Sequence, residues 1–156
     1  MRRLSRPIFA GLIAIALSGC AGAAPATPPE RNAVDARAAV IHRSPSCSCC
    51  GAWEAYLRGA GWQVTTVDEA EPDAFKTGLG LPVESWSCHT ALIEGYVVEG
   101  HVPLAAIEDL LAQRPAITGI ALPGMPAGSP GMPGAQEAPF VVLSISDSAI
   151  APFGSY

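Results

Sequence analysis

The sequence has little charge and no basic excess. Asp, Glu, Lys and Arg make up 15% of the 156 residues, and the formal net charge is −5. A protein that binds nucleic acid through its phosphates needs clustered basic residues, so the composition argues against that class of partner. Five cysteines are too few for a disulfide-dense scaffold, and their spacing must therefore indicate their role. The length predicts one compact domain.

Long apolar runs are also missing. Residues 8–17 form an uncharged apolar run, about half as long as a membrane-spanning helix needs to be, and three arginines precede it. The run ends in Leu17-Ser18-Gly19-Cys20, which resembles the bacterial lipobox, where the cysteine is lipidated and becomes the first mature residue. We therefore expect residues 1–19 to be a lipoprotein signal peptide and Cys20 to carry the lipid. An ordinary signal peptide is the alternative.

Either signal predicts that the mature chain lies outside the cytoplasm. Ala21 rather than Asp follows Cys20, which in bacteria with two membranes favours sorting to the outer membrane. Residues 20–35 are rich in Pro and Ala and predict an extended tether, followed by a folded domain over residues 36–156. We expect a periplasmic protein whose lipid anchor is its only contact with the membrane.

Residues 36–112 alternate between patterns typical of strands and helices. Apolar or β-branched runs predict strands, spacings of three and four residues predict helices, and Glu94-Gly95 joins two apolar runs as in a hairpin. The resulting order, β-α-β-(α)-β-β-α, matches a thioredoxin-like α/β fold with a mixed sheet and flanking helices. A ferredoxin-like fold is the main alternative. The expected elements are strands 38–41 and 62–67, helices 51–61 and 71–77, hairpin strands 90–93 and 96–99, and helix 103–112.

Residues 122–139 predict a long irregular loop. Prolines and glycines alternate through it, and neither a helix nor a central strand tolerates that composition. The apolar run 140–145 that follows predicts a last strand at the edge of the sheet.

The cysteines after the tether are gathered in two short clusters. Cys47, Cys49 and Cys50 open the first predicted helix, and Cys88-His89 comes directly before the hairpin. In a thioredoxin-like fold the loop after the first strand lies beside the loop before the hairpin. We therefore expect four thiols and an imidazole to meet at one corner. The helix N-terminus favours negative charge and should lower the pKa of the thiols placed there.

Three interpretations of these cysteines stay open on the residues alone. Structural disulfides suit an oxidising compartment, but a bridge to Cys88 would leave two thiols side by side. Cys47 and Cys50 have the C-x-x-C spacing of a redox dithiol. However, Cys49 intervenes, and no proline stands before the hairpin, where thioredoxin-like oxidoreductases carry one. The third interpretation is a metal site.

A metal site built from thiolates selects soft ions, namely Cu(I), Zn or the iron of iron–sulfur clusters. Haem attachment is excluded because Gly51 follows Cys50, whereas a single Zn could take three thiolates and His89. Cu(I) accepts low coordination by sulfur and bridging thiolates. Four gathered cysteines therefore suit several Cu(I) ions in one thiolate-bridged multinuclear cluster better than they suit a single ion.

Four motifs resemble a known family. Residues 44–53, 87–91, 95–103 and 123–132 resemble, in this order, a small bacterial family that includes the CopG copper-resistance proteins, which are unrelated to the ribbon-helix-helix repressors of that name. The resemblance covers about residues 37–145. It implies a periplasmic, thioredoxin-like protein that binds several copper ions through cysteine thiolates. The ligands that it implies are Cys47, Cys49, Cys50, Cys88 and His89.

Four other side chains are candidate copper ligands. His42 ends the first predicted strand near Cys47, and His101 follows the hairpin, although a histidine in such a place is more often structural than a ligand. Met125 and Met132 are soft thioethers in the Pro/Gly loop, where methionines also serve to cover apolar surface.

We therefore predict a copper-binding protein of the bacterial envelope that serves copper resistance, with other envelope copper-handling proteins as candidate partners. The alternative is a thioredoxin-like thiol–disulfide oxidoreductase that acts on envelope proteins. A third class, a structural envelope lipoprotein, leaves the gathered cysteines unexplained. No Ser/His/Asp arrangement or phosphate-binding loop is found. Metal binding is thus expected rather than catalysis, with redox activity of copper or thiols left open.

Overall fold

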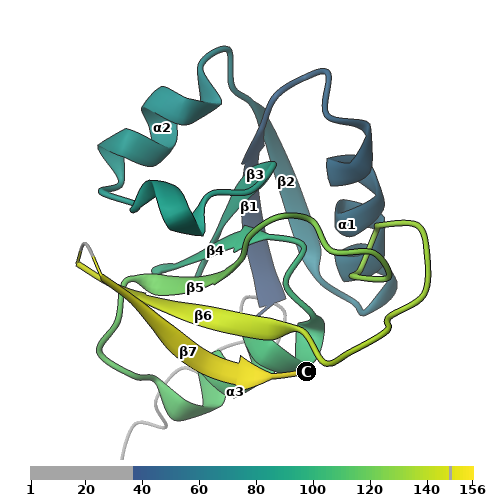
Figure 1. Cartoon of the computed structure of the whole chain (residues 1–156). Coiled ribbons are helices and arrows are strands. Elements are labelled where there is room, and N and C mark those ends of the chain that lie inside the picture. The colour runs from purple at the N-terminus through teal and green to yellow at the C-terminus, as the bar shows by residue number, and fades with distance from the viewer. Residues whose placement is uncertain (1–36, 148) are drawn as a thin grey trace, which may run out of the picture. The chain divides into compact units, whose positions relative to one another are not determined.

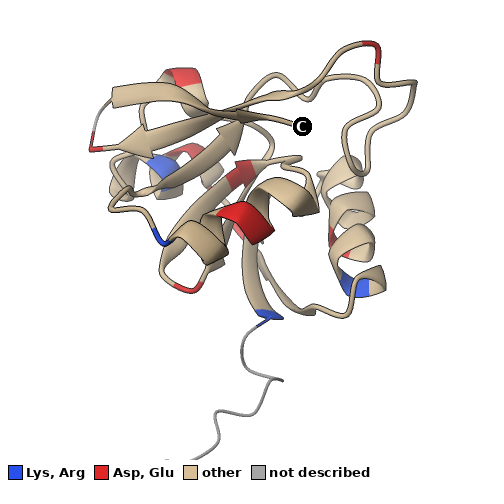
Figure 2. Cartoon of the chain, turned by 90° about the horizontal axis from the view of Figure 1, so that it is seen from below, with Lys and Arg blue, Asp and Glu red and all other residues tan. Residues whose placement is uncertain are grey.

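The computed structural model describes residues 37–147 and 149–156 (Figure 1). The expected signal peptide, Cys20 and the tether lie outside these residues. Within the described ranges, no helix is both long and apolar enough to cross a membrane. Charged positions are sparse along the ribbon (Figure 2), in keeping with the low charged fraction of the sequence.

The described strands form one mixed sheet. They are β1 (Ala38–Arg43), β2 (Gln63–Asp68), β3 (His89–Ile93), β4 (Tyr96–Gly100), β5 (Gly119–Leu122), β6 (Val141–Ser146) and β7 (Ala149–Ser155). Their order in the sheet is β2-β1-β3-β4-β5-β6-β7. β1 is parallel to β2 and antiparallel to β3, which forms the antiparallel hairpin with β4. β4 is parallel to β5, and the remaining neighbours are antiparallel.

Helices cover both faces of the sheet. They are α1 (Ser48–Gly59), α2 (Pro72–Gly78) and α3 (Leu104–Gln113), and a 3-10 turn, η2 (Val83–Ser85), follows α2. Trp53 and Leu57 of α1 pack with Ile107 and Leu110 of α3 in the larger core, because apolar residues at helical spacing fall on one side of each helix. A smaller core around Leu81, between α2 and η2, lies against the other face of the sheet.

The order of elements agrees with the prediction. β1, α1, β2, α2, β3, β4 and α3 follow one another as expected, and the α/β class with a mixed sheet is confirmed. The parallel pairing of β1 with β2 beside the β3–β4 hairpin is compatible with a thioredoxin-like fold. A ferredoxin-like sheet is a split βαβ, in which another strand separates the two parallel strands, whereas β1 and β2 are direct neighbours.

The C-terminal part of the sheet differs from the prediction. The strand predicted over residues 140–145 is present as β6, but its predicted place at the edge of the sheet is wrong, because β7 pairs with the outer side of β6. A turn at Asp147, whose φ is +50°, connects the two strands. Pro152 lies within β7, and a proline argues against a strand when only the sequence is considered. At the edge of a sheet, however, a proline is tolerated. β5, which is short and fully buried, was also not predicted.

Residues 123–140 contain no helix or strand, as predicted, and Figure 1 shows this loop beside α1. Among the glycines of the loop, Gly131 approaches α1 most closely. It has a φ of +84°, and a Cβ placed on it would lie 2.7 Å from the backbone nitrogen of Trp53. A glycine is therefore required where the loop crosses the first turns of α1.

Candidate metal centre

The three cysteines of the C-x-C-C motif lie at the N-terminal end of α1. Cys47 is the N-cap residue and has an extended backbone, whereas Cys49 and Cys50 belong to the first turn. The helix begins at Ser48 rather than at Gly51, so these two cysteines are part of the helix and not of the loop before it. A disulfide joins Cys47 to Cys50, and Cys49 carries a free thiol.

Cys88 faces this turn from the segment that precedes β3. Because β3 lies antiparallel to β1, the start of β3 comes beside the end of β1, where the C-x-C-C loop begins. Cys88 Sγ is 3.8 Å from Cys49 Sγ, which is 3.6 Å from Cys47 Sγ. The Sγ atoms of all four cysteines lie within 4.8 Å of one another. The expected meeting of the two clusters is therefore observed.

Two histidines approach Cys88 as well. His101 Nε2 lies 2.9 Å from Cys88 Sγ, and His89 Nδ1 lies 3.3 Å from it. The other nitrogen of His101, Nδ1, is 2.7 Å from the carbonyl oxygen of Pro130. A carbonyl oxygen only accepts hydrogen bonds, so Nδ1 carries the proton and Nε2 presents its lone pair to Cys88. Metal-binding imidazoles usually have this arrangement.

Burial determines the protonation of these groups. It lowers the pKa of His89 to about 3, with His101 adding to the effect, and it also lowers the pKa of His101. The neutral ring is the form that binds metals. Burial also raises the pKa of the Cys88 thiol to about 12, and the neighbouring Cys49 adds to the rise. We expected lowered thiol pKa values at the helix N-terminus. Cys88 faces that end from outside the helix, and desolvation dominates its pKa.

Cys88 is thus common to two groups of donors. The first contains the sulfurs of the four cysteines, and the second contains Cys88, His89 and His101, with ligand atoms again within 4.8 Å of one another. More sulfur and nitrogen donors are gathered here than one tetrahedral ion uses. The chemistry of this set fits soft metal ions, and a shared thiolate suits ions that lie side by side.

Two solved structures resemble this chain. They are named "Copper resistance protein copG- Form 1" and "Copper resistance protein copG- Form 2", and both are 40% identical to it over 76% of its length. The alignments cover 96% and 97% of those chains, with TM-scores of 0.69 and 0.70. The chain belongs to the CopG family of copper resistance proteins. A family model described as a protein of unknown function, DUF411, matches residues 85–132. No curated protein matches the chain.

The remaining candidate ligands of this CopG family member have different environments. His42 Nδ1 lies 2.7 Å from Glu69 Oε1, and its ring stacks on Phe75 with centroids 4.0 Å apart. Among the described residues, His42 belongs to neither donor group. Met125 is 39% exposed, whereas Met132 is half-buried next to Gly131, where the loop crosses α1. A copper-binding role for either methionine stays a prediction.

A buried ion pair between Lys76 and Glu99 was missed in the sequence. Lys76 of α2 is 2% exposed and Glu99 of β4 is 0% exposed, and Lys76 Nζ donates to Glu99 Oε1. The sequence does carry a signal for Glu99, since it interrupts the apolar strand that runs from Tyr96 to Gly100. A carboxylate at such a position needs a partner, but nothing in the sequence indicates that the partner is Lys76.

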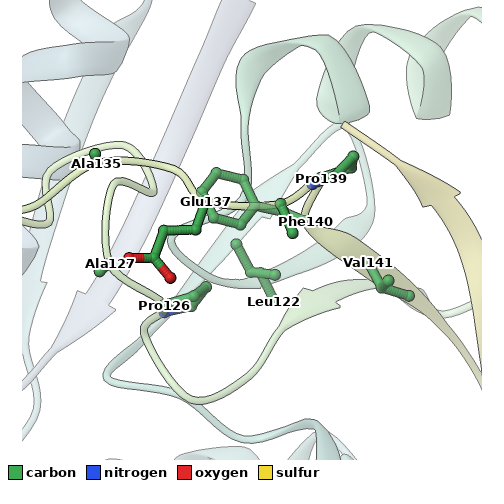
Figure 3. A pocket seen from close by; sticks show the side chains of 9 residues that line it. Leu122, Pro126, Ala127, Ala135, Glu137, Pro139, Phe140 and Val141 are labelled. Atoms are coloured by element: carbon green, nitrogen blue, oxygen red, sulfur yellow. The ribbon is translucent and has the colours of Figure 1, made fainter.

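A pocket of about 310 Å³ lies elsewhere, between the Pro/Gly loop and the start of β6 (Figure 3). It is mostly apolar, with Leu122 and Phe140 in its wall and the carboxylate of Glu137 at its side. The residues that line it include none of the cysteines or histidines described above. It is therefore separate from the candidate metal centre.

Proposed function

We propose that this protein is an extracytoplasmic copper-binding protein that holds several Cu(I) ions through the thiolates of its four clustered cysteines. The observation that carries the proposal is the gathering of the four Sγ atoms within 4.8 Å of one another, with His101 Nε2 2.9 Å from Cys88 Sγ. Its membership of a copper resistance family supports copper as the ion. Copper is here the cargo of the protein.

The donor set supports Cu(I) over Zn. Thiolates and neutral imidazoles bind both ions, but a single tetrahedral Zn uses four donors and would leave the others unused. Cys88 lies between the sulfur group and the two histidines, so its thiolate can bridge neighbouring ions. The disulfide between Cys47 and Cys50 has to be reduced by two electrons before these two sulfurs can bind metal.

The test is a metal titration of the anaerobically reduced protein. We expect uptake of more than one Cu(I) per chain and retention of the ions against a moderate chelator, with free thiols counted in parallel. A titration with Zn under the same conditions is the control. Uptake of one Zn per chain with negligible Cu(I) binding would contradict the multinuclear site.

We also propose that a lipid on Cys20 anchors the protein to the outer membrane, on its periplasmic side. The proposal rests on the Leu17-Ser18-Gly19-Cys20 sequence at the end of the apolar run. Cys20→Ser is expected to release a soluble extracytoplasmic protein whose copper stoichiometry is unchanged, because the cysteines of the centre are untouched. The measurement is the intact mass of the mature protein. An unlipidated wild-type N-terminus downstream of Cys20 would show that the anchor does not exist.

A second candidate function is thiol–disulfide exchange with envelope proteins. The disulfide between Cys47 and Cys50, which have C-x-x-C spacing at a helix N-terminus, favours it. Cys88 stands directly before β3, where thioredoxin-like oxidoreductases carry a proline, and this argues against it. Turnover of a disulfide substrate by the copper-free protein, together with negligible Cu(I) binding, would favour exchange over copper binding.

A further inference from the structure

Ser87, the residue directly before Cys88, has both of its backbone polar groups bonded to buried side chains. Lys76 Nζ donates to the carbonyl oxygen of Ser87 at 2.7 Å. The Ser87 N–H donates to Glu99 Oε1, also at 2.7 Å. The segment between η2 and β3 is outside the strand ladder, so these side chains supply the partners that a ladder would otherwise give.

The same pair reaches the other side of the metal-binding segment. The Thr90 hydroxyl donates to Glu99 Oε2 at 2.6 Å. Ser87 and Thr90 flank Cys88 and His89 in the chain, so one carboxylate holds the residues on both sides of the two candidate ligands. Glu99 also lies two residues before His101, whose Nε2 is 2.9 Å from Cys88 Sγ. The end of β4 therefore carries Glu99, which holds the segment around Cys88, and leads directly to His101, a candidate ligand.

The approach of Ser87 to β4 is close. A Cβ placed on Gly100 would lie 2.5 Å from the side chain of Ser87, so only glycine leaves room for it. Gly100 has a φ of +79°, which also favours glycine. The position of Ser87 is thus fixed by packing against β4 as well as by hydrogen bonds to Lys76 and Glu99.

Stability alone is a weak reason for a buried ion pair at this place. Removing two charges from water costs free energy, and apolar replacements of a buried pair are often equally stable or more stable. A pair that holds a ligand-bearing segment has a function that apolar side chains cannot supply, because they neither donate to the Ser87 carbonyl nor accept from its N–H.

We propose that the Lys76–Glu99 pair is a positioning element of the metal centre, which fixes Ser87 so that Cys88 stays within ligand distance of Cys49 and His101. This inference rests on the proposed function, because the placement of Cys88 matters for copper only if Cys88 binds it. Neither Lys76 nor Glu99 belongs to the two groups of donors. Its effect is on how tightly ions are held, because changing the pair removes none of the four cysteines and alters only the position of Cys88.

The test compares Lys76→Met, Glu99→Leu and the double variant, because leucine, unlike glutamine, cannot accept from the Ser87 N–H. Each carries Cys20→Ser in the full mature chain, so that the clustered cysteines are the only thiols that can bind copper or the arsenical. The single changes remove charges of opposite sign and would alter the thiolate character of Cys88 in opposite directions. If the changes instead displace Cys88, both single variants bind less tightly. The double variant leaves no uncompensated charge and is expected to regain folding stability, but its Ser87 carbonyl still lacks a donor.

Glu54→Leu is the matched control. Glu54 is 5% exposed and accepts hydrogen bonds from Arg43 Nε and Thr66 Oγ1, both at 2.9 Å. It is therefore a comparably buried carboxylate, held by partners that do not include Ser87 or Thr90. It shows how far a general loss of stability lowers copper retention.

Two measurements are made on every variant. The first is the retention of Cu(I) against a chelator after anaerobic loading, where we expect losses of about 10–100-fold in all three pair variants, as for other residues that orient metal ligands. The second uses no copper. Phenylarsine oxide bridges two neighbouring thiols with release of one water, and in the disulfide-bonded protein it can bridge the free thiols of Cys49 and Cys88.

We expect half-saturation of all three pair variants to need a concentration of phenylarsine oxide at least about tenfold higher than for wild type, the lower end of such effects, in a titration without added thiols that keeps the disulfide intact. Glu54→Leu should resemble wild type in both measurements. The proposal is overturned if the two single variants shift arsenical binding in opposite directions, if the double variant regains wild-type values, or if Glu54→Leu loses as much. If wild type binds no copper, the proposed function fails, and the arsenical alone decides whether the pair positions Cys88.

Discussion

Replacing Cys88 with serine will lower the copper content of the reduced protein by at least one ion per chain. Cys88 is the donor shared by both groups, with Cys49 Sγ at 3.8 Å and His101 Nε2 at 2.9 Å from its sulfur. Serine removes a soft ligand but keeps nearly the same volume, so folding should survive while the remaining copper becomes easier to remove. The measurement is copper per chain after anaerobic loading, followed by retention against a chelator.

His42→Gln is the control for this experiment. His42 was also a candidate ligand, but it is bonded to Glu69 and lies outside both donor groups, so its copper content should equal that of wild type. Circular dichroism of both variants shows whether the fold is kept. A Cys88→Ser protein with wild-type copper content and wild-type retention would place Cys88 outside the site, and the C-x-C-C motif would then bind copper alone.

Cys88 also illustrates what could be predicted from the sequence. Its distance from Cys50 in the chain gives no local reason for contact. The alternation of strand and helix patterns, however, predicts a sheet in which the start of β3 lies beside the end of β1. The helices and strands that make up this alternation have clear local signals, such as the helical spacing of Trp53 and Leu57 or the turn at Glu94-Gly95. The corner that gathers the sulfurs could therefore be inferred from topology.

Features that depend on a single long-range contact could not be predicted. The orientation of His101 is set by the carbonyl of Pro130, and the segment around Cys88 is held by Lys76 and Glu99. No periodicity or motif connects these residues, because each contact forms only when separate elements pack together. The strand β7 was missed for a related reason, since its pairing with β6 outweighs the weak strand character of a segment that contains Pro152.

The protonation of Cys88 shows a similar limit. A helix N-terminus lowers thiol pKa values, and this local rule predicts lowered values for the thiols placed there. The thiol of Cys88 is buried by elements distant in the chain, and burial raises its pKa to about 12. A rule for the first turn of a helix cannot be carried to a residue that only faces that turn.

The disulfide-bonded protein is expected to bind fewer soft metal ions than the reduced protein. With Cys47 and Cys50 joined, the free thiols of the centre are those of Cys49 and Cys88, and the nearest imidazole nitrogen is His101 Nε2. These donors suit one low-coordinate ion, whereas reduction adds two thiolates and allows several. The measurement is a titration with Ag(I), a soft ion that resembles Cu(I) in its preference for sulfur but does not reduce the disulfide.

The titration is made on the Cys20→Ser chain before and after treatment with a phosphine reductant, with the thiols counted in both samples. Two thiols are expected in the disulfide-bonded sample and four in the reduced one, since each broken disulfide releases two thiols. An equal number of Ag(I) ions in the two samples would mean that Cys47 and Cys50 are not ligands. A higher number after reduction would mean that the redox state of one disulfide sets how much metal the centre holds. Copper uptake in an oxidising compartment would then depend on a supply of electrons to Cys47 and Cys50.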